Sequence, residues 1–66
     1  MRNGQKLQTA RNAIGDTAGF YDEFTVAQTI EWNPQIPEQE LRDALRSMVK
    51  TGCIVRVSLG RYRWTI

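Results

Sequence analysis

The fifteen residues GCIVRVSLGRYRWTI, at positions 52–66, decide how this chain folds, because apolar side chains alternate with arginine there. Alternation with a period of two is typical of β-strands, and Ser58-Leu59-Gly60 interrupts it near the middle. The stretch therefore predicts a β-hairpin of two short strands. Such a ribbon is only marginally stable alone in water, so we expect earlier parts of the chain to cover one of its faces.

The alternation also predicts which face of the hairpin is covered. We expect the covered face to carry Cys53, Val55, Val57, Tyr62, Trp64 and Ile66. We expect the opposite face to carry Ile54 and to present three arginines to solvent, Arg56, Arg61 and Arg63. The hairpin would then seal the core with one face and offer positive charge with the other.

Helical spacing of apolar residues predicts a first helix near the amino terminus. The spacing is set by Leu7, Ala10 and Ile14. We expect this helix to span residues 5–14, with Asn3 as its N-cap and Gly15 as its end.

Three aromatic residues, Phe20, Tyr21 and Phe24, follow in a short connection, and we expect them to drop onto the core. Phe24-Thr25 suits a brief extended segment, and Thr25 suits the N-cap of a second helix that begins at Val26. Its predicted apolar side consists of Val26, Ala27 and Ile30. Asn33-Pro34 ends this helix, because the residue before a proline is disfavoured in helical conformation.

The third and longest predicted helix covers residues 37–51. Its apolar positions are Leu41, Ala44, Leu45, Met48 and Val49. Lys50 complements the negative end of the helix, and Gly52 supplies the left-handed residue that stops it.

Composition excludes several classes of function. The chain has 66 residues, no histidine and a single cysteine, Cys53. An internal disulfide, a zinc site and a catalytic dyad or triad that uses histidine are therefore excluded. We expect one domain, no cofactor, no metal and no enzymatic activity, because a core of this size leaves no room for a deep cleft.

Charge is separated along the chain. Residues 1–11 carry three bases, residues 12–40 carry six acids and no base, and residues 41–66 carry six bases with Asp43 as their only acid. This separation predicts a molecule with a negative side and a positive side. The sequence also lacks an apolar run long enough for a signal peptide or a membrane span, so we expect a cytoplasmic protein without a membrane partner.

The ordered set of segments resembles the winged helix-turn-helix family of bacterial and phage regulators. The segments that carry the resemblance are FTVAQTIEW at 24–32, IPEQELRDALRSMVKTGCIVRV at 36–57 and GRYRW at 60–64. It implies an α+β fold of three helices with a carboxy-terminal two-stranded wing and room for a short first strand. It covers roughly residues 5–66.

The resemblance also implies a function and a site. The helix at 37–51 would be the recognition helix, and the hairpin would be the wing that contacts double-stranded DNA. The implied contacts on the helix are Gln39, Arg42 and Arg46, and those on the wing are Arg56, Arg61 and Arg63. Lys50 joins them because Arg42, Arg46 and Lys50 recur every four residues and form one stripe. The expected protein is a small regulator of transcription or recombination.

Acidic residues near the start of the third helix leave alternatives open. These residues are Glu38, Glu40 and Asp43, and their charge opposes insertion into the major groove of DNA. The wing could lead the contact with DNA instead. Alternatively, a phage or mobile-element protein could use this fold to bind a host protein, with Trp32 and Pro34 as an anchor. Trp32 could equally cover the edge of the core, and the chain could act as a monomer or a weak homodimer.

Overall fold

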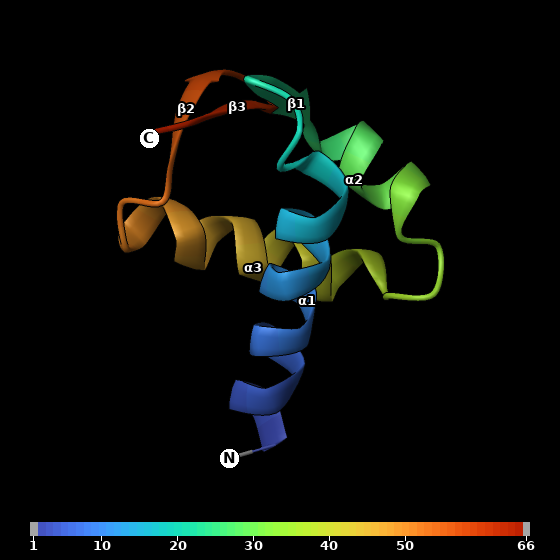
Figure 1. Cartoon of the computed structure of the whole chain (residues 1–66). Helices are drawn as coiled ribbons and strands as arrows, with labels where there is room; N and C mark the ends of the chain where they lie inside the picture. Colours follow the sequence, from blue (N-terminus) through green and yellow to red (C-terminus); the bar gives the residue numbers. More distant parts are fainter. Residues whose placement is uncertain (1, 66) are drawn as a thin grey trace.

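The computed structural model describes the backbone of residues 2–65 and the side chains of residues 7–65. This part of the chain forms an α+β arrangement of three helices and a three-stranded antiparallel sheet (Figure 1). The elements are α1 (Arg2–Ala18), β1 (Glu23–Thr25), α2 (Val26–Trp32), α3 (Glu38–Lys50), β2 (Ile54–Ser58) and β3 (Arg61–Trp64).

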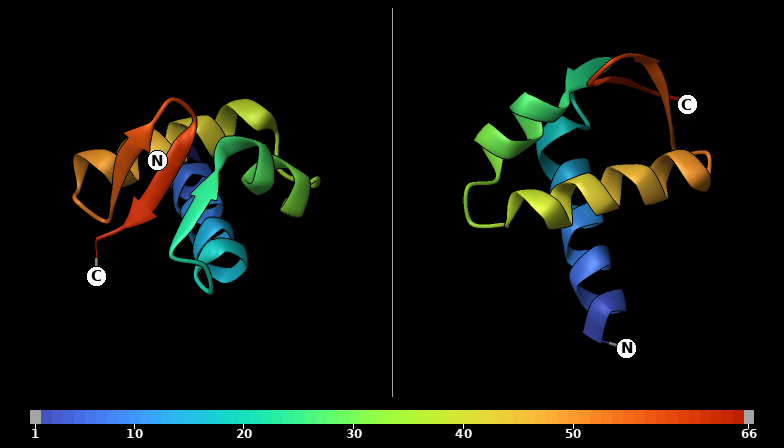
Figure 2. Two further views of the ribbon diagram at one scale, coloured as in Figure 1. Left: turned by 90° about the horizontal axis from the view of Figure 1, so that it is seen from above. Right: turned by 180° about the vertical axis from the view of Figure 1, so that it is seen from behind.

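The sheet has the strand order β1-β3-β2, so β3 lies in the middle. Phe24 of β1 pairs with Tyr62 of β3, and Tyr62 pairs on its other side with Arg56 of β2. Seen from above, the sheet lies over α1 and α3, which cross beneath it (Figure 2). The β2–β3 turn and the α1–β1 turn lie at opposite ends of the sheet, because β1 runs antiparallel to β3.

The prediction of a first helix at 5–14 was too short at both ends. α1 begins at Arg2 and passes through Gly15 to Ala18, so Asn3 lies inside the helix and is not its N-cap. With 17 residues, α1 is also longer than α3, which has 13 and had been expected to be the longest element.

Core contacts explain why Gly15 does not end α1. Ala10, Ile14 and Ala18 are all fully buried, so the apolar stripe continues one turn beyond the glycine. A glycine inside a helix costs about 1 kcal/mol relative to alanine, which is less than the burial of apolar surface along another turn can return. The hydroxyl of Thr17 donates to the carbonyl oxygen of Ala13 at 2.8 Å, which further ties this last turn to the helix.

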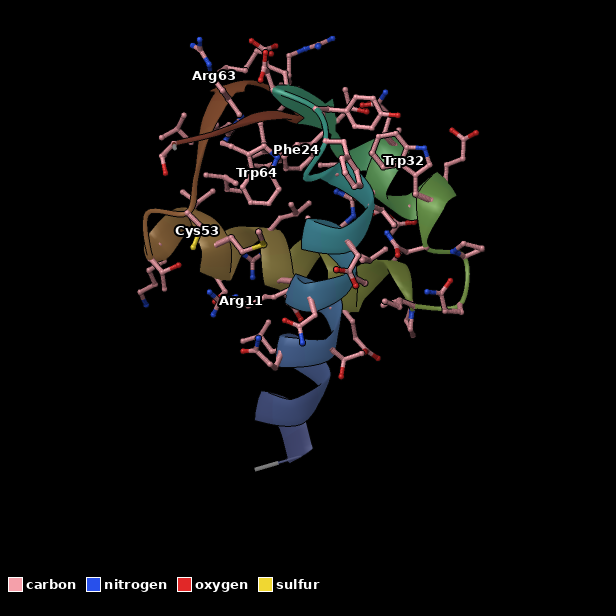
Figure 3. The ribbon with its side chains drawn as sticks, in the orientation of Figure 1. Arg11, Phe24, Trp32, Cys53, Arg63 and Trp64 are labelled. Carbon is pink, nitrogen blue, oxygen red and sulfur yellow. The ribbon has the colours of Figure 1, made fainter. Side chains whose placement is uncertain are left out.

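Of the three aromatic residues expected on the core, only Phe24 is buried. The ring of Phe24 packs against Tyr62 and Trp64 of β3, with ring centroids 6.1 and 5.5 Å away. Figure 3 shows Phe24 beside Trp64. Phe20 is 90% exposed and Tyr21 is 51% exposed, so their predicted burial is wrong. Both lie in the turn before β1, where the alternation of the strand has not yet begun.

The predicted cap of α2 is confirmed. Thr25 Oγ1 accepts a hydrogen bond from the backbone N–H of Gln28 at 3.1 Å, and Gln28 Oε1 accepts one from the N–H of Thr25 at 2.9 Å. This reciprocal pair is a capping box. The predicted apolar face was wrong at Ala27, which is exposed, because Thr29 is the fully buried residue of this helix.

Gly52 ends α3 as predicted, and the geometry of this end fixes the hairpin. Gly52 has φ +85°, its N–H donates to the Val49 carbonyl, and the N–H of Cys53 donates to the Met48 carbonyl. This pattern is a Schellman motif. It turns the chain so that Ile54, directly after Cys53, enters the core and is fully buried.

The predicted facing of β2 was therefore wrong by one residue. Ile54 pairs with Trp64 and Arg56 with Tyr62, so Ile54 and Arg56 share the face that looks toward the helices. Val55 and Val57 are 44% and 42% exposed and do not cover the core. The facing of β3 agrees with the prediction, since Tyr62 and Trp64 pack against the core. The prediction for Ile66 lies outside the described residues.

Candidate nucleic-acid interface

An open groove lies between α3 and the hairpin. Its apolar lining comes from Val26, Leu45, Val49 and Tyr62. Its basic lining comes from Arg42, Arg46 and Lys50 of α3 and Arg56 of β2, and we call these four residues with the hollow between them the basic groove.

The groove extends toward the β2–β3 turn. A second hollow shares Val26, Arg42, Arg56 and Tyr62 with the first and adds Ala27, Ile30, Leu59 and Gly60. The combined surface therefore runs from the carboxy-terminal half of α3 to the tip of the hairpin beside α2. Leu59 at this tip is 89% exposed.

The four basic side chains come from two elements, and each element places its side chains for a different reason. Arg42, Arg46 and Lys50 share one side of α3 because their spacing of four residues nearly matches the helical repeat. Arg56 reaches the same surface because the Schellman motif and the register of β2 turn its side chain to the face of Tyr62. The stripe on α3 was predicted, whereas the approach of Arg56 to it was not.

Carboxylates neutralise part of the positive charge on α3. Arg42 Nε lies 2.8 Å from Glu38 Oε2, and Arg46 Nη1 lies 3.4 Å from Asp43 Oδ1. The same oxygen of Asp43 accepts a hydrogen bond from Gln39 Nε2 at 2.9 Å. All these groups are at least partly exposed, so the pairs are weak and can exchange for other partners.

The basic groove is least neutralised toward the end of α3. Among the described side chains, neither Lys50 nor Arg56 forms an ion pair. Arg56 makes only a 3.4 Å hydrogen bond from its Nε to the carbonyl oxygen of Ser58. These two side chains are therefore the most available to an anionic partner.

The other two predicted wing residues lie on the opposite face of the sheet. Arg61 and Arg63 alternate with Tyr62 and so point away from the groove, and Figure 3 shows Arg63 directed away from the helices. Arg61 Nη1 lies 3.7 Å from Glu23 Oε1. Arg63 borders a separate shallow hollow with Asp22 and Val55. The three arginines of the hairpin do not form one face, contrary to the prediction.

Two contributors to this surface were missed at the level of sequence. Tyr62 had been assigned to the core but is only half-buried and also lines the groove, and Val49 is exposed at its edge. The sequence feature that could have identified them is the set of basic residues that surrounds them, on α3 and on β2. Recognising that these basic residues share one surface required the correct register of β2.

Other kinds of site have little support within the described residues. No three Cys, Asp or Glu side chains there are grouped so that they could hold a metal ion. No helix in residues 2–65 has both the length and the apolar character that a membrane span requires.

No protein-family model, no curated protein and no solved structure matches this chain. Its own geometry and charge are therefore the basis for assigning a function.

Proposed function

We propose that the chain is a small module of the winged helix-turn-helix type that binds double-stranded DNA and regulates transcription or recombination. The order of the elements supports this fold, because three helices with a short strand between the first two are followed directly by a hairpin. In this assignment α3 is the recognition helix and β2–β3 is the wing.

The observation that carries the proposal is the convergence of Arg42, Arg46, Lys50 and Arg56 on one groove. Arg56 comes from a different element than the other three, yet all four border the same hollow. Lysine and arginine side chains that track a surface neutralise phosphates and release condensed counterions, which provides most of the affinity for DNA. A phosphate backbone lying along this groove would meet charge from both walls.

The acids of α3 fit this mode of binding better than deep insertion of the helix. Glu38 and Asp43 already hold Arg42 and Arg46, and an approaching phosphate competes with them for these guanidinium groups. Base edges would be contacted by Gln39, whose side chain can form paired hydrogen bonds with adenine, while Arg42 stays on phosphate. The expected result is modest affinity with a strong dependence on salt.

A titration of mixed-sequence duplex DNA, followed by fluorescence anisotropy at several salt concentrations, tests the proposal. Four phosphate contacts predict a log-log slope of about −3.6 for the affinity against salt. The variant R46A/R56A should weaken binding and reduce the slope to about −1.8, because two contacts are lost. The variant R61A/R63A removes the same charge from the opposite face and serves as the matched control.

Each outcome of this titration has a distinct meaning. Loss of affinity only in R46A/R56A supports the groove. Loss mainly in R61A/R63A would assign the contact to the outer face of the wing. Equal small losses in both variants would indicate nonspecific attraction, and no binding by the unmodified chain would reject the DNA-binding function and favour the alternative of a host protein as partner.

A further inference from the structure

Two exposed aromatic residues and one half-buried one, Trp32, lie at the end of the sheet opposite the β2–β3 turn. Tyr21 stacks on Trp32 with ring centroids 5.1 Å apart and an interplanar angle of 15°. Phe20, directly before Tyr21, is 90% exposed and is the most exposed of the large apolar residues in the described chain. We call Phe20, Tyr21 and Trp32 the aromatic patch; Figure 3 shows Trp32 on the outside of the molecule, away from Trp64.

The ends of two helices meet at this patch. α1 ends at Ala18 and α2 ends at Trp32, and a 3.1 Å hydrogen bond from Asn33 Nδ2 to Thr17 Oγ1 holds the two ends together. The carboxy-terminal end of a helix carries partial negative charge. Neither helix has a basic residue in its last turn, so this charge is not offset as Lys50 offsets it in α3.

Acidic side chains add full charges to the same end of the molecule. Asp16, Asp22 and Glu31 lie within four residues of the aromatic patch along the chain, and all three are exposed. None of them forms an ion pair with another described side chain. The acids near the aromatic patch therefore outnumber the one described base at this end of the sheet, Arg63, which borders a hollow with Asp22. This excess of negative charge disfavours DNA and other polyanions there.

The patch is also separated from the proposed DNA contact. In the β1–β3 ladder, Glu23 at the start of β1 lies opposite Arg63, and Thr25 at its end lies opposite Arg61, beside the hairpin turn. The patch precedes Glu23, whereas the second hollow, beside the basic groove, reaches Leu59 and Gly60 at the β2–β3 turn. Figure 2 shows this turn and the α1–β1 turn at opposite ends of the sheet. A partner could hold the patch while the groove is occupied.

We propose that the aromatic patch docks a cationic segment of another protein, in which arginine or lysine alternates with apolar side chains. An apolar side chain of that segment covers Phe20, and a guanidinium or ammonium group lies over the exposed face of the Tyr21–Trp32 stack. The acids and the two helix ends supply the complementary charge. This inference goes beyond DNA binding and does not depend on it.

The test uses the full isotope-labelled chain and a synthetic peptide that alternates arginine and leucine, with a peptide that alternates glutamate and leucine as the control ligand. NMR titration should show shifts of the Phe20, Tyr21 and Trp32 signals with the arginine peptide only. Phe20→Ser should weaken binding by roughly tenfold, as expected when an exposed aromatic anchor is removed. D16N/E31Q should also weaken it, and added salt should weaken it further.

Leu59→Ser is the matched control, because Leu59 is 89% exposed at the opposite end of the sheet. Its affinity for the arginine peptide should equal that of the unmodified chain. Absence of binding, equal binding by the Phe20→Ser variant, or shifts confined to β2 and β3 would each overturn the proposal. Self-association in sedimentation that Phe20→Ser abolishes would also overturn it, by identifying a second copy as the occupant. None of these results depends on whether the basic groove binds DNA.

Discussion

The indole Nε1 of Trp64 donates a hydrogen bond to the carbonyl oxygen of Ala18 at 3.1 Å, which joins the last strand to the end of the first helix. The ring of the same residue lies against Phe24, with centroids 5.5 Å apart (Figure 3). One side chain therefore fastens β3 to both α1 and β1.

Trp64→Phe should separate the hydrogen bond from the packing of the ring. The phenyl ring retains most of the contact with Phe24 but cannot donate to Ala18. The Ala18 carbonyl still accepts a hydrogen bond from the N–H of Tyr21, so it is not left unsatisfied. We expect a loss of about 1 kcal/mol in the free energy of unfolding for Phe and about 3 kcal/mol for Ala, measured by urea denaturation. Equal losses for both variants would contradict this separation.

Two glycine substitutions test the extent of α1 and the geometry of the hairpin turn. A Cβ at Gly15 or at Gly60 would meet no atom within 4 Å, so packing does not oppose either change. Gly15 is helical, and Gly15→Ala should stabilise the chain by about 0.5–1 kcal/mol. A destabilising Gly15→Ala, in the same denaturation assay, would show that α1 ends at the glycine.

Gly60 has φ +73°, and Gly60→Ala should destabilise the chain by about 1–2 kcal/mol.

Local chemistry made most of the elements predictable. The cap at Thr25, the stop at Asn33-Pro34 and the left-handed Gly52 each follow from short-range rules that involve only neighbouring residues. The end of α1 was not predictable in this way, because the burial of Ala18 depends on contacts far away in the sequence. A glycine signal was overridden by tertiary packing.

The facing of β2 shows why part of the site was missed. Alternation predicts that two sets of residues face opposite ways, but it does not say which set is inside when both contain apolar side chains. Ile54 and Val55 were equivalent candidates, and the choice was made by the turn at Gly52 and Cys53. The stripe on α3 needed no such choice, so Arg42, Arg46 and Lys50 were grouped correctly from spacing alone.

Asn33 should be essential for the junction between α1 and α2. It is 2% exposed, and its Nδ2 donates to the Thr29 carbonyl at 2.9 Å and to Thr17 Oγ1 at 3.1 Å. Asn33→Ala removes both bonds and leaves the buried acceptors without this donor, so we expect a loss of about 1–3 kcal/mol. Gln35→Ala, at an exposed position nearby, should change the stability by less than about 0.5 kcal/mol. Similar effects of the two changes in thermal or urea unfolding would contradict this role for Asn33.

Asp43 should limit the affinity for DNA if the basic groove is the contact surface. Its Oδ1 accepts from Gln39 Nε2 at 2.9 Å and lies 3.4 Å from Arg46 Nη1, so one carboxylate occupies two proposed contact residues. Asp43→Asn keeps the shape of the side chain but removes its charge.

We expect tighter binding of Asp43→Asn to mixed-sequence duplex DNA with a salt slope nearly unchanged, because Arg46 is already one of the four phosphate contacts and no longer has to leave Asp43 to reach its phosphate. Gln39→Ala should leave this nonspecific affinity nearly unchanged and reduce any preference among sequences, since Gln39 carries no charge. Glu40→Gln is the control, because it removes one acid from the same helix at a residue that forms no ion pair with another described side chain. Anisotropy titrations of the three variants at matched salt concentrations compare them directly. If Glu40→Gln tightened binding as much as Asp43→Asn, net charge alone would account for the gain, and the specific restraint of Arg46 by Asp43 would be rejected.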